Sequence, residues 1–521
     1  MNSNLAIALT GITLFATLAI PAQLVAQEHS GLQQQQKHHT HYRVIDTGSF
    51  GGPNSHMSIG AHILNNNGMF TGFADTVESD PYAPGGCWDG DCLVAHTFRW
   101  SHGELTELGV IDAGPNSESN WISDNGLIAG DSQNGLLDPL VGGWQIRGVL
   151  WRNDEAIDVG TSGGGYNSLA RGLNSAGEVV GLSTTLVPDS NAMILSFGLP
   201  YAYQTRAFRW KNGHMLDLGT LGGPDAMALG VNESGQIFGN SYTSLDASPV
   251  CGNPESGFDA LTTGAFLWQK GKMTNLGSFG GTCTNALALN NRGQVVGYSF
   301  LVQDATFHPF RWEQGKLIDL GTLGGDFGVA THLNEAGDVV GWANPPNGEV
   351  IHATLWSGGH TSDLGALGPD QCSVPFGINS RKQVVGAVAL NCDFNDDPSL
   401  RAFLWEPGGQ MIDLNTLISP SLGIQLRNVA TINDRGEMAA VAFFPDGNHR
   451  PVLLIPCGAQ QQDSEDCQDS AGLNTMSTMQ GNRTAAPTVQ RNNRNAETLP
   501  AGVRGLLARR HPVDSAGTRK K

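Results

Sequence analysis

The chain has 521 residues, of which 69 are glycine and only 15% are charged, and its formal net charge is -19. This acidic balance argues against a nucleic-acid partner, because lysine and arginine contacts to phosphate dominate such binding. Many glycines with few charges favour short strands joined by tight turns over long helices with charged surfaces. The composition therefore indicates an all-β protein.

The amino terminus resembles an export signal. Residues 5–20 form an apolar run, followed by Pro21 and the small-residue sequence Leu24-Val25-Ala26. This pattern predicts a signal peptide over residues 1–26. No lysine or arginine precedes the run, so an uncleaved anchor is the alternative, although the run is short for about 30 Å of hydrocarbon. The polar, low-complexity residues 27–41 predict a flexible leader.

Three signatures recur in the same order, eight times each. They are an Asn-x-x-Gly turn running into a strand, an Ala-Phe-x-Trp strand, and an Asp-Leu-Gly-Thr-Leu-Gly-Gly segment. Successive signature tryptophans lie 44 to 59 residues apart, and such a period indicates a repeat architecture. The turns begin at Asn65, Ser123, Asn174, Asn232, Asn290, Asn334, Asn379 and Asn433. The tryptophans are Trp100, Trp151, Trp210, Trp268, Trp312, Trp356 and Trp405, with Leu454 in the eighth copy.

Each repeat predicts four antiparallel strands, which in the fourth copy cover residues 228–232, 236–242, 263–268 and 273–276. Four strands in about 45–50 residues match one blade of a β-propeller. The strand at 263–268 is apolar on both faces, as packing between blades requires, whereas a two-layer sandwich would leave one face polar. We therefore predict a β-propeller over residues 42–458, with eight blades and seven as the alternative count.

The ends of the repeat region predict how the ring closes. Residues 42–48 look like a fourth strand with no blade before it, and residues 450–455 look like a third strand with no fourth strand after it. The first strand can therefore complete the last blade, which removes free sheet edges.

The three motifs resemble the HAF family of probable extracellular repeats, over about residues 42–455. The resemblance implies a secreted or surface-exposed bacterial protein. The family has no established activity or catalytic residues, so no residue role can be transferred. Some relatives end in a Pro-Glu-Pro sorting signal with a membrane helix. This chain has no such signal, and we expect no transmembrane segment in the mature protein.

Length variation falls between the second and third strands, in residues 76–93, 186–203, 244–261 and 389–399. Variable loops on a rigid scaffold usually carry binding residues, and Trp88 is the candidate ligand contact among them. The eight cysteines lie in loops or after the last strand, which predicts disulfides in an exported chain. Sequential pairing is the simplest of 105 possibilities: Cys87–Cys92, Cys251–Cys283, Cys372–Cys392 and Cys457–Cys467.

No catalytic signature stands out from the repeat pattern. Residues 160–164 match the G-x-S-x-G motif of hydrolases, but they occupy the place of Gly-Thr-Leu-Gly-Gly in other repeats. Asp393, Asn395 and Asp397 alternate as calcium ligands do, but Pro398 replaces the glycine of such loops. Arginines align with His96, His308 and His352 in other repeats, which indicates a role at the blade edge. We predict no catalytic residues, no metal site and no cofactor.

The carboxyl-terminal residues 459–521 are rich in glutamine, asparagine and arginine and predict a disordered tail. From Arg483 onward it contains 9 basic and 2 acidic residues. Contact with an anionic envelope polymer and a solvated tail without function both stay open. We expect a secreted or cell-surface monomer that binds or scaffolds an extracellular polysaccharide or protein. The alternative is an extracellular hydrolase or lyase with its site at the mouth of the central channel, since propellers host both roles.

Overall fold

The computed structural model describes residues 40–458 except 60, 84–86, 89–90, 113, 141, 195–201, 249, 252–259, 347, 349, 369–370, 391, 393 and 395–398. The predicted signal peptide, most of the leader and the tail lie outside the described residues, as do Asp393, Asn395, Asp397 and Cys467. The described strands all belong to one compact unit, His41–Lys521. This unit is a β-propeller, as predicted.

Each repeat forms a set of four antiparallel strands, called A to D in chain order and named by its A strand. The first four sets are β2 (Gly51–His56), β3 (Phe70–Ser79), β4 (Leu93–Ser101), β5 (Glu104–Glu107); β6 (Ser117–Ile122), β7 (Ile128–Leu137), β8 (Trp144–Arg152), β9 (Glu155–Asp158); β10 (Gly164–Leu173), β11 (Val179–Pro188), β12 (Tyr203–Lys211), β13 (His214–Asp217); and β14 (Ala226–Val231), β15 (Ile237–Ala247), β16 (Leu261–Gln269), β17 (Lys272–Asn275).

The remaining strands continue the same order. They are β18 (Gly280–Leu289), β19 (Val295–Leu301), β20 (Phe307–Glu313), β21 (Lys316–Asp319); β22 (Gly328–Leu333), β23 (Val339–Ala343), β24 (His352–Ser357), β25 (His360–Asp363); β26 (Cys372–Ile378), β27 (Val384–Ala389), β28 (Arg401–Trp405), β29 (Ile412–Asp413); and β30 (Gln425–Ile432), β31 (Met438–Phe443), β32 (His449–Pro456), with β1 (Tyr42–Asp46) as the D strand.

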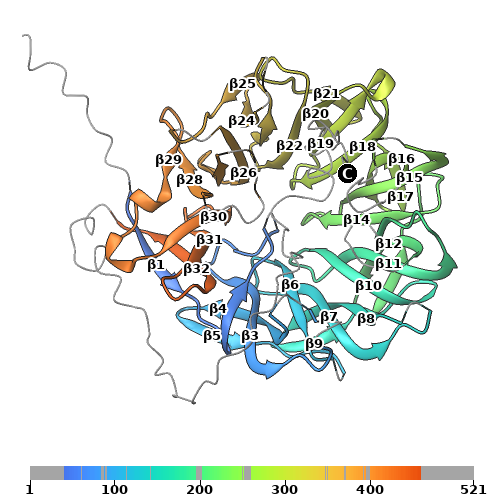
Figure 1. Cartoon of the computed structure of the whole chain (residues 1–521). Helices are drawn as coiled ribbons and strands as arrows, with labels where there is room; N and C mark the ends of the chain where they lie inside the picture. Colours follow the sequence, from blue (N-terminus) through green and yellow to red (C-terminus); the bar gives the residue numbers. More distant parts are fainter. Residues whose placement is uncertain are drawn as a thin grey trace, which may run out of the picture. The chain divides into compact units, whose positions relative to one another are not determined.

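The described strands form six four-stranded sheets and one eight-stranded sheet. The larger sheet contains the β14 and β18 sets, which are joined by a single parallel pair, Thr263 with Cys283. In Figure 1 the A strands β6, β14, β22, β26 and β30 lie nearest the middle of the ring. The number of blades depends on how the eight-stranded sheet is divided, so the count of eight stays a prediction.

Strand β16 explains why the C strands are apolar on both faces. Phe266 and Trp268 pack in a cluster with the preceding β10 set, and Ala265 and Leu267 pack in a cluster with the following β18 set. All four side chains are buried, and each large one contributes about 1.5–3 kcal/mol by leaving water. The C strands thus serve two interfaces each, as predicted. The signature tryptophans are buried in the core, apart from the half-buried Trp405.

The B and C strands are longer than the sequence predicts. In the β14 set they cover Ile237–Ala247 and Leu261–Gln269, because pairing continues past the repeat motif. An irregularity in the ladder after Tyr242 allows Ala247 to pair with Leu261, as a β-bulge does. The extra length forms hairpin arms that project beyond the shared core.

Strand β1 completes the last set, which confirms the predicted closure. It pairs antiparallel with β32, from Tyr42 opposite Pro456 to Asp46 opposite Val452, and Figure 1 shows the two strands side by side. Tyr42 and Val44 are buried in the cluster of this set. Arg450 also binds Asp46, with Nε 3.2 Å from Oδ2.

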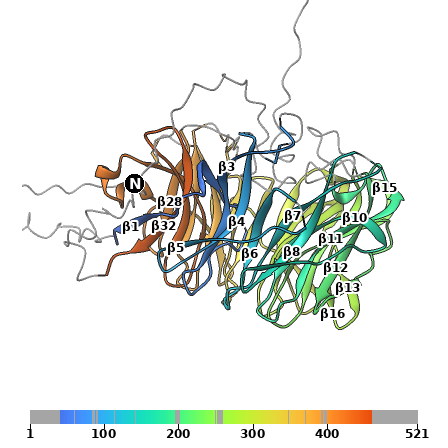
Figure 2. The same ribbon diagram turned by 90° about the horizontal axis from the view of Figure 1, so that it is seen from below.

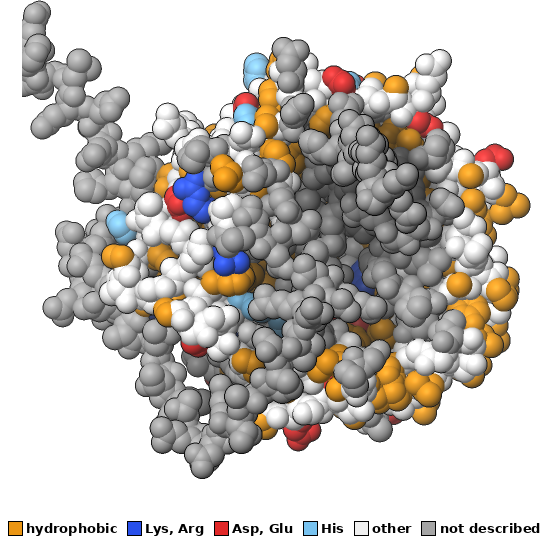
Figure 3. Space-filling model, in the orientation of Figure 1, with side chains coloured by type: hydrophobic (Ala, Val, Ile, Leu, Met, Phe, Trp, Pro, Cys, Tyr) orange, Lys and Arg blue, Asp and Glu red, His pale blue; other side chains and the backbone are white. Residues whose placement is uncertain are grey.

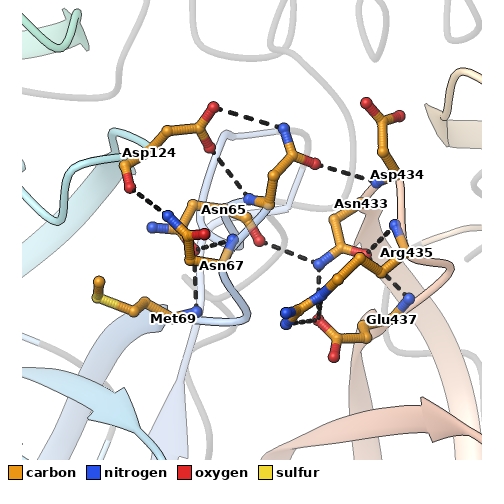
Figure 4. Close-up of polar contacts among 9 residues, drawn as sticks. Asn65, Asn67, Met69, Asp124, Asn433, Asp434, Arg435 and Glu437 are labelled. Atoms are coloured by element: carbon orange, nitrogen blue, oxygen red, sulfur yellow. Dashed lines mark hydrogen bonds and ion pairs between the residues drawn. The ribbon is translucent and has the colours of Figure 1, made fainter.

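The Asn-x-x-Gly turns form a second closure. The side-chain amide of Asn433 donates to the backbone oxygen of Asn65 at 3.0 Å, across the junction of the last and first sets (Figure 4). The same bond joins successive turns elsewhere, for example Asn334 to Asn379 at 3.1 Å. Ser123 has no amide, and there Asn125 Nδ2 donates to the oxygen of Ser175 at 2.8 Å. A continuous ring of hydrogen bonds therefore runs through all eight turns.

Each asparagine of the ring also organises its own turn. Asn334 Oδ1 accepts from the backbone N–H groups of Ala336 and Asp338, both at 3.0 Å, and its Nδ2 also donates to Asp338 Oδ2 at 3.0 Å. With the bond to Asn379, the side chain uses its full capacity of four hydrogen bonds. This explains why seven of the eight repeats have asparagine at this position.

Asn334→Ala should lower the free energy of unfolding by about 2–4 kcal/mol, because it leaves buried donors and an acceptor without partners. The matched control is Glu335→Ala at the next, exposed position, which should cost less than about 1 kcal/mol. Urea unfolding of both variants checks the difference. Equal losses would contradict a structural role for the asparagine ring.

Candidate functional site

The connections at the two ends of the strands differ in length and charge. Segments between B and C strands, and between D strands and the next A strands, lie together at one end, called here the long-loop face. In Figure 2 the strands run between this face and the opposite one. The sequence of the long-loop segments contains seventeen aspartates and glutamates and no lysine or arginine. The opposite turns carry both signs, including Arg292, Arg381 and Arg435.

An aspartate begins the B–C loop in three consecutive sets. The backbone N–H of Asp80 donates to the oxygen of Cys92, that of Asp138 to Gly143 and that of Asp189 to Ala202, at 2.7 to 2.9 Å. Each carboxylate accepts from the N–H group two residues further on, at 2.8 to 2.9 Å. These hydrogen bonds hold the ends of the loops together.

Polar side chains from the following set form hydrogen bonds with the aspartates of these loops. Asn116 Nδ2 donates to Asp80 Oδ2 at 2.9 Å, and Asn167 Nδ2 donates to Asp138 Oδ2 at 2.8 Å. In the β14 set Asp225 takes the equivalent place and accepts from the N–H groups of Met193, at 2.8 Å, and Thr205, at 3.0 Å. Burial raises the pKa of Asp225 to about 7, although these two N–H groups favour its charged form.

Large apolar side chains are exposed at the tips of the B–C hairpins. Those of the β2, β6, β10 and β14 sets are between 47% and 79% exposed. They lie where the B strands extend beyond the core, as the exposed ends of β3, β7, β11 and β15 show. Figure 3 shows hydrophobic side chains along the lower right of the molecule, over β7 to β11. We call this group the apolar rim: Val77, Leu136, Leu137, Leu140, Leu186, Val187 and Leu245.

Exposed large hydrophobic side chains are rare elsewhere among the described residues. Val302 and Leu390 lie at the corresponding hairpin ends of two later sets. Leu216 in β13 and Ile318 in β21 lie instead on outer D strands. The concentration at the hairpin tips therefore follows the repeat, and Leu216 is a natural control for exposure outside the rim.

Trp88 lies in the B–C loop of the β2 set, as predicted, but half-buried. It packs against a cluster that includes Ile146, Leu169, Leu182 and Tyr203 from the next two sets. Its backbone N–H donates to Asp80 Oδ2 at 3.1 Å. Trp88 thus joins the bases of adjacent hairpins, and its predicted role as a ligand contact stays a prediction.

Three of the predicted disulfides are present. Cys87–Cys92 closes the B–C loop of the β2 set, Cys251–Cys283 joins the β14 and β18 sets, and Cys372–Cys392 lies within the β26 set. Cys457 is also disulfide-bonded, and its predicted partner Cys467 lies outside the described residues. The first three of these bonds secure the long-loop face, where the loops are longest.

The strand-C histidines form cross-strand pairs rather than one cluster. His308 Nδ1 lies 2.8 Å from Asp319 Oδ2, and His352 Nδ1 lies 2.9 Å from Asp363 Oδ2. Burial alone would raise the pKa of Asp319, but the hydrogen bonds from His308 and Gly321 hold it below its usual value. Other sets use the same positions for His96–Glu107, Arg206–Asp217, Arg401–Asp413 and Arg450–Asp46.

The G-x-S-x-G segment also follows the repeat. The N–H of Gly160 donates to Asp158 Oδ1 at 2.7 Å, as Gly219 does to Asp217 and Gly321 to Asp319. This is the shared turn after strand D rather than a turn into a helix, which a hydrolase motif requires. Within the described residues, histidine, cysteine, aspartate and glutamate form no group of three that could hold a metal ion.

A stack of rings that the sequence did not predict lies between the first and last sets. His56 stacks on Phe73 with ring centroids 4.9 Å apart and meets His449 edge-on at 5.1 Å. His449 stacks on Phe443, over which the Arg427 guanidinium lies. Burial, with the nearby His449, lowers the pKa of His56 to about 4. No local pattern could reveal this stack, since its members come from opposite ends of the repeat region.

Known proteins resemble this chain only distantly. No family model and no curated protein matches the chain. The β-propeller domain of the Trilobed protease from Pyrococcus furiosus matches 72% of this chain and 95% of its own, with 9% identity and a TM-score of 0.39. TolB from Acinetobacter baumannii matches 73% and 95%, with 11% identity and a TM-score of 0.31. The Pyrococcus horikoshii acylaminoacyl peptidase matches 62% of this chain and half of its own, with 10% identity and a TM-score of 0.36.

None of the helices in the described part of the chain is long and apolar enough to cross a membrane.

Proposed function

We propose that this chain is an exported, HAF-like propeller that binds another protein through its long-loop face. The apolar rim is the observation that carries the proposal, because clustered exposed apolar side chains mark interaction sites. Its members are leucine and valine, which suit a protein partner better than a polysaccharide. The disulfides support an oxidising location outside the cytoplasm.

The negative charge of the long-loop face indicates the charge of the partner. Glu78 and Asp246 are exposed beside Val77 and Leu245 of the rim, and the long-loop segments contain no basic residue to balance them. A partner with apolar side chains flanked by lysine or arginine would match both features. The candidate partner is therefore a basic, apolar polypeptide surface.

The test uses the full, oxidised protein and a synthetic basic amphipathic peptide as the probe. Leu136→Ser combined with Leu137→Ser should weaken binding of the peptide at least about tenfold, since each lost apolar contact costs roughly 1 kcal/mol or more. Leu216→Ser, at a leucine outside the rim that is 47% exposed, should leave the affinity unchanged. Fluorescence anisotropy measures both dissociation constants.

A panel of insoluble and soluble polysaccharides tests the other hypotheses. Depletion of the protein by a polysaccharide, unaffected by the double substitution at the rim, would replace the protein partner with a glycan. Release of new sugar ends would make the chain a hydrolase or lyase instead. The proposal expects neither result.

A further inference from the structure

The carboxyl-terminal tail contains a short segment whose chemistry matches the long-loop face. Residues 503–510 read Val-Arg-Gly-Leu-Leu-Ala-Arg-Arg, so they combine aliphatic side chains with three arginines in eight residues. The apolar rim offers aliphatic side chains, and the surrounding segments offer carboxylates without any lysine or arginine. The tail segment and the long-loop face are therefore complementary in both polarity and charge.

We propose that residues 503–510 occupy the apolar rim of their own chain and compete there with the external partner. This inference rests on the proposed function, because it takes the rim to be a docking surface. It adds regulation to that function, since the tail and the external partner would compete for the same side chains of the rim.

The contacts expected at the rim explain the choice of this segment. Leu506 and Leu507 would pack against Leu136 and Leu137, which are exposed at the end of β7. The arginines would approach Glu78, which is exposed in the neighbouring β2 set, and pair with its carboxylate.

The opposite face is a poorer match for the same segment. The A–B turns there mix four cations, Arg292, Arg381, Lys382 and Arg435, with seven carboxylates, so their net charge is only -3, against -17 for the long-loop segments. Among the described residues, that face also lacks the row of exposed aliphatic side chains, since the hairpin arms that carry them extend from the other ends of the strands. Charge and polarity therefore both direct the segment to the long-loop face.

The tail is long enough to reach the rim. Strand β32 begins after the B–C loop and ends at Pro456, so the chain leaves it at the face opposite the rim. Residues 459–502 lie between the end of the described part and the segment, and as extended chain they would span at most about 150 Å. A domain of this size has a diameter of roughly 55 Å. Reaching around the edge of the molecule therefore needs only part of the available length.

The first experiment maps where the segment lies in the full, oxidised chain. A photo-crosslinking amino acid replaces Leu506, and peptide mapping identifies its targets after the monomer is separated from larger species. The inference expects crosslinks to residues 128–144, 179–188 or 237–247 within one chain. Crosslinks to the A–B turns, crosslinks only between two chains, or no crosslink at all would each overturn it.

The second experiment measures competition with the same basic amphipathic peptide. Replacing Arg504, Arg509 and Arg510 with glutamine in the full chain should tighten binding of the peptide by about three- to tenfold, because an attached segment acts at a high effective concentration. The matched control replaces Arg483, Arg491 and Arg494 with glutamine. It makes the same charge change elsewhere in the tail and should leave the affinity within about twofold of the wild type.

The outcomes separate this inference from the proposed function. Equal affinities in wild type, variant and control, with binding still lost in the Leu136 and Leu137 double substitution, would leave the face as a docking site and remove the tail from it. Binding that ignores the rim substitutions would contradict the proposed function itself. In that case the crosslinks alone would decide where the tail lies.

Discussion

A chain that begins at Thr47 should lose at least about 4–5 kcal/mol of stability relative to a chain that begins at His41. The shorter chain lacks β1, which supplies five residue pairs to β32 and buries Tyr42 and Val44. Truncation of one large buried aromatic side chain alone costs about 3–5 kcal/mol. Loss of β1 also exposes the edge of β32 and so invites aggregation.

Thermal melting and hydrogen exchange check this expectation. The melting temperature should fall, and the amides of β32 should lose protection first, because their partners on β1 are gone. Tyr42→Ala in the longer chain should reproduce much of the loss, while Arg43→Ala, at an exposed position of the same strand, should not. An unchanged melting curve after removal of β1 would mean that the ring closes in another way.

Much of the fold was predictable because each repeat contains the local sequence signals for its own turns and strands. The Asn-x-x-Gly signature specifies a turn through one side chain, and Asn334 shows why, with every polar atom of that side chain bonded. Ser123 departs from the pattern, and the structure moves the linking role two residues on, to Asn125. The unpaired strands at the two ends of the region were sufficient to predict that β1 pairs with β32.

The candidate site was less predictable because exposure there depends on neighbours. Leu245 falls in residues 244–261, which the sequence predicts to be a loop, yet it lies in strand β15 and is 79% exposed. The hairpin extends past the point where adjacent sets can cover it, and the sequence does not encode that limit locally. Trp88 lies in the predicted loop, but it is half-buried between hairpins, and that packing also depends on residues of the next two sets. The long-loop face was predictable, and its apolar rim was not.

His56 and Asp225 should give the protein two opposite responses to pH. The pKa of His56 is lowered to about 4 by burial and by His449, against about 6.5 in an unfolded chain. The unfolded state therefore binds more protons, and the contribution of His56 to stability is lost as the pH falls from about 6.5 to 4. The pKa of Asp225 is raised to about 7 by burial and by Asp189, so its folded state binds more protons, and stability is lost as the pH rises from about 4 to 7.

The two effects are each worth about 3–4 kcal/mol across this window and largely cancel in the wild-type protein. Substitution of either residue should therefore reveal the pH dependence of stability that is due to the other. His56→Phe keeps an aromatic ring on Phe73, and the stability of this variant should fall as the pH rises from 4 to 7. Asp225→Asn, the residue found at the equivalent positions 116 and 167, should give a protein whose stability rises over the same interval.

Urea unfolding at half-unit steps of pH measures these slopes, and the slope rather than the absolute stability is the decisive quantity. Asp225→Asn places an amide where a carboxylate accepted from Met193 and Thr205, so its stability should drop by a constant amount that leaves the slope readable. Asp246→Asn, at an exposed carboxylate, should retain the wild-type profile. Slopes of the same sign in the two variants would contradict the assignment. His56 stays neutral in the folded protein by losing its proton, so it costs stability as the pH falls. Asp225 stays neutral by keeping its proton, so it costs stability as the pH rises.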